Sequence, residues 1–122
     1  MSLKTKEIWF IVGSQYLYGP KVLDTVAARG AEMAAYIDAQ KQIPCRFVYK
    51  GTIKTADEIE RLAQEANYSD VCCGVVTWMH TFSPSKMWIS GLNLLQKPYC
   101  HLATQYNREI PDQEIDMDFM NL

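Results

Sequence analysis

The chain has 122 residues, of which 48% are hydrophobic and 21% charged, and its formal net charge is -2. This is the composition of a globular protein, and the length is too short for two ordinary domains. The basic residues are scattered, which argues against nucleic acid as a partner. The chain does not open with the pattern of a signal peptide, and it has no apolar run of the roughly 18 residues that a membrane span requires. We therefore expect a single soluble domain over residues 1–122, located in the cytoplasm.

An apolar run at residues 8–12 is followed at once by a polar and aromatic loop at residues 13–20. A near-continuous apolar run is typical of a strand that is buried on both faces of a parallel sheet. In such sheets, ligands bind beyond the carboxyl ends of the strands. The loop at residues 13–20 is therefore the first candidate for a functional site.

The rest of the chain alternates between helical and extended patterns. Apolar spacing, a capping box at Thr55–Glu58 and the helix-start signal Ser83-Pro84 predict three helices and three further strands. The helices are expected over residues 21–41, 55–67 and 83–97, and the strands over residues 45–50, 71–79 and 98–104. Gly30 shares the apolar face of the first helix, which indicates close packing on the sheet. The second strand is the more polar one and is expected nearer an edge.

This alternation of strands and helices predicts right-handed crossovers and a parallel sheet. We expect an α/β fold, a flavodoxin-like three-layer sandwich with a four-stranded parallel sheet in the order 2-1-3-4. The first and third strands would then flank the switch point of the sheet. Residues 14–18 and 79–83 would come close together there.

The loop after the first strand does not match a phosphate-binding motif, because five residues separate Gly13 from Gly19 and most of them are bulky. The amide of Gln15 and the rings of Tyr16 and Tyr18 suit a neutral polyol, which offers hydroxyls and C–H surfaces. An interface loop whose aromatic rings pack on another subunit is an equally open interpretation.

Other candidate residues have simpler explanations. His80 follows the third strand without a carboxylate beside it, and His101 is expected in the core. The cysteines show no C-x-x-C spacing and no matching histidine pair; they are Cys45, Cys72, Cys73 and Cys100. Three of them lie in apolar strand-like runs, where a free cysteine usually acts as a small buried hydrophobic residue, so a structural role is favoured over a zinc or redox site. The acidic tail at residues 108–122 lacks the glycine and glutamate of a calcium loop. The pattern predicts a polar crevice without catalytic residues.

Three separated segments nevertheless carry a specific resemblance. GSQYLYGP at residues 13–20, VVTWMHTFSPSKMWISGL at 75–92 and IDMDFMNL at 115–122 together resemble the amino-terminal part of the L-arabinose isomerase family. The resemblance implies interconversion of L-arabinose and L-ribulose through an ene-diol, with D-galactose to D-tagatose as a side activity. It also implies Mn²⁺ in the full-length enzyme, bound by later domains, and none bound by this chain. Trimers paired into hexamers are the assembly it implies.

Carried over by position, the resemblance assigns Gln15, Leu17, Tyr18 and Phe82 to the sugar pocket of a neighbouring subunit. It assigns this chain no catalytic and no metal-binding residue, so the chain alone is expected to be inactive. The family commonly has histidine at the position of Tyr16, which puts a proton-carrying role there in doubt. The tail at residues 108–122 is expected to lead to a further domain. The alternative is a free-standing flavodoxin-like module that binds a sugar or a protein, with a flavin carrier as a distant third.

Overall fold

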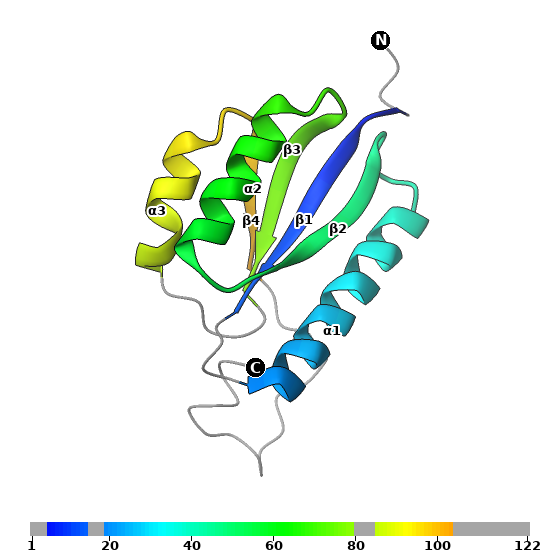
Figure 1. Ribbon diagram of the computed structural model, residues 1–122. Helices are drawn as coiled ribbons and strands as arrows, with labels where there is room; N and C mark the ends of the chain where they lie inside the picture. The colour runs from blue at the N-terminus through cyan, green and yellow to red at the C-terminus, as the bar shows by residue number, and fades with distance from the viewer. Residues whose placement is uncertain (1–4, 15–18, 80–84, 104–122) are drawn as a thin grey trace.

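The computed structural model describes residues 5–14, 19–79 and 85–103, and these form a parallel sheet with helices on both faces (Figure 1). The strands are β1 (Glu7–Gly13), β2 (Arg46–Ile53), β3 (Cys72–Trp78) and β4 (Tyr99–Leu102), and the helices are α1 (Gly19–Ala39), α2 (Ala56–Tyr68) and α3 (Ser85–Leu94). Within this described part, no helix is both long enough and apolar enough to cross a bilayer.

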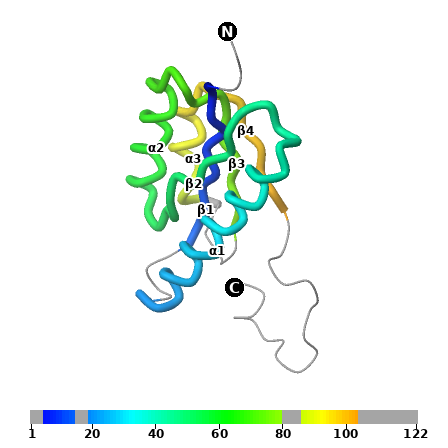
Figure 2. The backbone as a smooth tube through the Cα atoms, turned by 90° about the vertical axis from the view of Figure 1, so that its right-hand side faces the viewer, coloured from blue at the N-terminus to red at the C-terminus, as the bar shows by residue number. Residues whose placement is uncertain are grey.

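The strand order is β2-β1-β3-β4 and every pairing is parallel. Helix α1 covers one face of the sheet, and α2 and α3 cover the other (Figure 2). The predicted three-layer fold and its strand order are therefore confirmed. The prediction that the second strand lies at an edge is also confirmed.

The central strand β1 divides the core into two layers. Trp9 and Ile11 face the cluster under α2 and α3, whereas Phe10 and Val12 face the cluster under α1. All four side chains are almost completely buried, because β1 has a neighbouring strand on each side and helices on both faces. The continuous apolar run is thus the sequence signature of this central position.

Gly30 lies where α1 comes closest to the sheet. A Cβ atom added at this residue would lie 2.8 Å from Val12 Cγ2 and 3.4 Å from Tyr49 Cε1. No residue larger than glycine fits there without a shift of its neighbours. The predicted close approach of this helix to the sheet is confirmed.

The second strand extends beyond its predicted end. Strand β2 continues three residues further, to Ile53, through an irregular pairing in which Phe10 and Ile11 pair with Tyr49 and Gly51. Gly51 has a φ of 143°, a conformation that side chains rarely adopt. The change of register there lets the strand bend and continue, which a simple alternation of apolar residues does not predict.

The prediction that His101 belongs to the core is wrong, because its strand β4 is the outermost and His101 is exposed. Cys100 is exposed for the same reason, contrary to the expected buried role. Cys72 is buried as expected, and its Sγ donates a weak hydrogen bond to Gly74 O at 3.4 Å. Burial also raises the pKa of the Cys72 thiol.

Candidate functional site

The carboxyl ends of β1 and β3 lie side by side, at the same end of the sheet. Val12 pairs with Trp78, so the segments that follow Gly13 and Trp78 leave adjacent strands at nearly the same level. From β1 the chain passes to β2 on one side, and β3 lies on the other side. This is the predicted switch point, the usual position of a ligand crevice in open parallel sheets.

The predicted sugar-pocket residues follow these two strand ends in the chain. Gln15, Leu17, Tyr18 and Phe82 lie outside the described residues, as do Tyr16 and His80. The structure therefore gives the positions from which the two loops depart, and the assignment of the pocket residues stays a prediction.

Ser14 anchors the start of the first loop. It is completely buried, and its backbone N–H donates to Ile53 O at a distance of 2.9 Å. Ile53 is the last residue of β2, so the bond joins the carboxyl ends of β1 and β2. The first residue after β1 is thus held by the sheet itself.

Aromatic side chains pack against one another within the strands that lead to these carboxyl ends. Trp78, the last residue of β3, has no exposed surface and stacks on Phe10, with 6.1 Å between the ring centroids and 19° between the planes. Phe10 in turn contacts Phe47 of β2, with centroids 5.2 Å apart. These three rings connect the three strands of the switch point in one packed layer.

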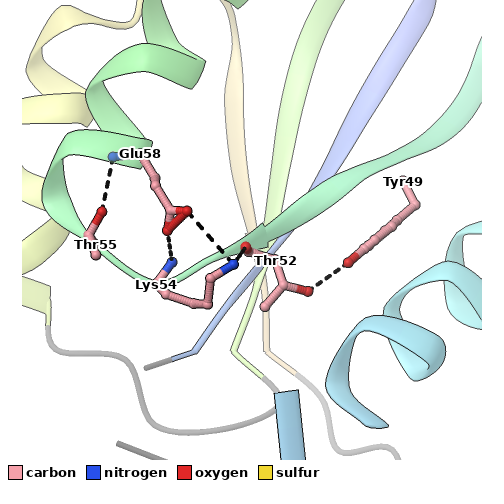
Figure 3. Close-up of polar contacts among 5 residues, drawn as sticks. All are labelled: Tyr49, Thr52, Lys54, Thr55 and Glu58. Carbon is pink, nitrogen blue, oxygen red and sulfur yellow. Dashed lines mark hydrogen bonds and ion pairs between the residues drawn. The ribbon is translucent and has the colours of Figure 1, made fainter. Parts of the chain in front are cut away.

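A polar cluster holds the turn from β2 into α2 (Figure 3). The Tyr49 hydroxyl and Thr52 Oγ1 are 2.6 Å apart, and Lys54 Nζ donates to Thr52 O at 2.9 Å. Lys54 Nζ also lies 3.7 Å from Glu58 Oε2. These polar groups bind one another, and the contacts hold the turn in place.

The predicted capping box is confirmed in one half and altered in the other. Glu58 N–H donates to Thr55 Oγ1 at 3.2 Å, as a capping box requires. The Glu58 carboxylate, however, accepts from the N–H of Lys54 at 2.9 Å rather than from Thr55. The carboxylate therefore stabilises the last residue of the approach to the helix, one position earlier than the motif predicts.

A second polar contact joins the last two strands. The buried Thr77 Oγ1 lies 2.7 Å from the Tyr99 hydroxyl and 2.9 Å from His101 Nδ1. Sequence reasoning missed this contact because Thr77 stands inside an apolar run. The register of β3 and β4, which pairs Thr77 with His101, is the feature that brings the groups together.

Among the described residues, no three histidine, cysteine, aspartate or glutamate side chains gather to hold a metal ion. At the carboxyl ends of the strands, the described residues are a packed aromatic layer and the buried Ser14. The described residues thus form a doubly wound parallel α/β domain, a class in which ligands bind beyond the carboxyl ends of the strands.

Comparison with known proteins identifies the family. The model of the L-arabinose isomerase N-terminal domain matches residues 2–122, and the chain belongs to this family. The chain is 57% identical over 122 residues to the L-arabinose isomerases of Koribacter versatilis and Herpetosiphon aurantiacus, and 52% identical over 122 residues to that of Flavobacterium johnsoniae. These matches cover the whole of this chain, which spans about 24% of the length of each relative.

Proposed function

We propose that this chain acts as the amino-terminal domain of a cytoplasmic enzyme that interconverts L-arabinose and L-ribulose, with D-galactose as a second substrate. Its role is to shape the sugar pocket and the interface between subunits, while the chemistry takes place on later domains. The observation that carries this proposal is the match to one family over residues 2–122, at up to 57% identity to proteins named L-arabinose isomerase. The same match favours this function over a free-standing binding module.

The geometry supports the pocket assignment. The loops that carry Gln15, Leu17, Tyr18 and Phe82 depart from adjacent strand ends, where Val12 pairs with Trp78. Amide and hydroxyl groups with aromatic rings suit a neutral sugar, which offers hydroxyls to hydrogen-bond and C–H surfaces to pack. In a trimer or a pair of trimers, these loops would complete the pocket of the neighbouring subunit.

The proposed division of labour extends to the metal. Among the described residues, no three histidine, cysteine, aspartate or glutamate side chains gather. The ligands of Mn²⁺ would come from the later domains. Gln15 and Tyr18 would bind and orient the sugar, and the packed layer beneath them would keep their strand ends in place.

The direct test is a chimera in which this chain replaces the corresponding segment of the Koribacter versatilis enzyme. We expect the chimera to retain kcat/KM for L-arabinose within about tenfold, a change of about 1.4 kcal/mol in transition-state stabilisation. The isolated chain with Mn²⁺ should show no turnover above a control without protein. The same relative without its amino-terminal segment serves as the negative control. A folded but inactive chimera, or turnover by the isolated chain, would overturn the proposal.

Within the active chimera, Gln15→Ala and Tyr18→Ala are each expected to raise KM for L-arabinose by roughly three- to tenfold, since a hydrogen bond contributes about 0.5–1.5 kcal/mol. Initial rates over a range of arabinose concentrations measure this effect. Tyr36→Ala is the matched control, because Tyr36 is exposed on α1. If KM stays unchanged in both variants, these residues do not contact the sugar.

A further inference from the structure

Two cysteines that are 28 positions apart in the sequence touch at the amino end of the sheet. Cys73 Sγ donates a weak hydrogen bond to Cys45 Sγ, with the sulfur atoms 3.7 Å apart. Both side chains are half-buried. Cys73 belongs to β3, and Cys45 immediately precedes β2. The pair lies at the end of the sheet opposite to the candidate sugar site.

The strands that carry the two cysteines are not neighbours, because β1 lies between them. The adjacent residues Arg46 and Cys72 both pair with Glu7. With strands about 4.8 Å apart, β2 and β3 are separated by about 9.6 Å. A disulfide spans Cα atoms less than about 7 Å apart. The two thiols therefore meet by reaching across β1, and a direct bond between them would require the backbone to move.

We propose that Cys45 and Cys73 form a two-thiolate site for a single soft monovalent cation of the Cu(I) class. Thiolate sulfur lies about 2.3 Å from a bound ion such as Zn²⁺, so two sulfurs that share one ion of this size are at most about 4.6 Å apart. The observed separation of 3.7 Å needs an opening of less than about 1 Å to reach even a linear arrangement.

The number of ligands selects the class of ion. Structural zinc sites use four ligands, whereas no group of three or more histidine, cysteine, aspartate or glutamate side chains is found among the described residues. Thiolate ligands select soft ions, and among these Cu(I) is satisfied by few ligands. Within the described part of the chain, no third histidine, cysteine, aspartate or glutamate joins the two sulfurs, which favours Cu(I) over zinc.

Cys45 lies beside a cavity that is lined by residues of both charges. Two thiols lose two protons as one Cu(I) binds, which leaves a complex with a net charge of -1. Cys45 lines a cavity of about 410 Å³ together with Lys41 and Arg46, and the guanidinium of Arg46 also lies 3.9 Å from the carboxylate of Glu7. Asp38 also lines this cavity, and its Oδ1 accepts from Phe47 N–H at 2.9 Å.

Burial raises the pKa of Cys45 above its ordinary value, and the neighbouring Cys73 raises it further. Because metals bind cysteine as the thiolate, proton release on binding is a signature of the site. The raised pKa also slows oxidation, because the thiolate is the reactive form.

The test measures Cu(I) binding to the whole chain without oxygen, with a chromophoric Cu(I) chelator as competitor. We expect one tightly bound Cu(I) per chain, with two sulfur ligands in the X-ray absorption spectrum. Cys45→Ser and Cys73→Ser should each weaken binding by more than about 100-fold, since even an outer-shell partner contributes 10- to 100-fold. Cys100→Ser is the matched control, because it removes an exposed thiol from β4. The corresponding alanine variants replace any serine variant that fails to fold.

Two results would overturn the site. One is Cu(I) affinity that falls equally in the Cys100→Ser control, or that persists when Cys45 or Cys73 is replaced. The other comes from treating the metal-free chain with glutathione disulfide and mapping its linkages by mass spectrometry. The two cysteines should remain unlinked, whereas a quantitative Cys45–Cys73 disulfide would make the pair a redox site and not a metal site.

Discussion

Replacing Trp78 by alanine is expected to lower the free energy of unfolding by about 3–5 kcal/mol, the usual cost of removing a large buried aromatic side chain. Trp78 has no exposed surface, and its ring stacks on Phe10 at the centre of the sheet. A domain of this size is stable by only about 5–15 kcal/mol. The substitution would thus remove a large part of the total stability, and it would loosen the end of β3, from which the segment with the proposed pocket residue Phe82 continues.

Urea unfolding followed by circular dichroism measures this loss for the chain. Tyr68→Ala is the matched control, because Tyr68 is also aromatic but is 88% exposed at the end of α2. The free energy of unfolding of this control should change by less than about 0.5 kcal/mol, as is usual for surface substitutions. Equal losses in the two variants would mean that the stacked layer under the switch point contributes nothing specific to stability.

Gly91→Ala is expected to destabilise the chain by about 1–3 kcal/mol through overpacking, although alanine favours a helix by about 1 kcal/mol over glycine. A Cβ atom at Gly91 of α3 would lie 2.1 Å from Ile59 Cγ2 and 3.1 Å from the Ile59 carbonyl carbon. Ile59 is itself buried in α2 and is β-branched, so its methyl group cannot rotate away freely. The close approach of α2 and α3 depends on this glycine.

The control for this variant is Ser90→Ala, which adds no atom that meets α2 because Ser90 is exposed on α3. A double variant, Gly91→Ala with Ile59→Leu, removes the branching methyl group and should recover part of the lost stability. Thermal melts of the single and double variants measure this coupling. A stabilised Gly91→Ala single variant would show that the two helices are free to separate.

The central layer of the fold was predictable from local patterns. The apolar run of β1 indicates burial on both faces, and the alternation of strands and helices leaves few parallel topologies. Gly30 on the apolar face of α1 predicts a close approach of this helix to the sheet, and a Cβ atom there would lie 2.8 Å from Val12 Cγ2. These features are local in sequence, which is why composition and spacing reveal them.

The errors lie where tertiary position overrides the local pattern. His101 and Cys100 stand in a strand with apolar neighbours, yet they are exposed because β4 is the outermost strand. The extension of β2 past Gly51 depends on a change of register with β1. Neither the exposed edge nor the change of register leaves a periodic trace in the sequence.

The candidate site was predictable only in its position. The switch point between β1 and β3 follows from the strand order, whereas the bond from Ser14 to Ile53 O depends on how the strand ends meet. The contact between Cys45 and Cys73 was likewise hidden, since their spacing matches no metal or redox motif. Contacts between residues distant in sequence require the register of the sheet.

The central place of β1 has a consequence for synthesis of the chain on the ribosome. This strand is made first, yet its partners β2 and β3 end at Ile53 and Trp78. At about 5–20 residues per second, the Phe10 and Ile11 side chains wait roughly 3–13 s before both neighbouring strands exist. An apolar segment exposed for that time is a natural substrate for a chaperone that binds nascent chains. Early protection of the first strand is therefore an expected requirement for high yield.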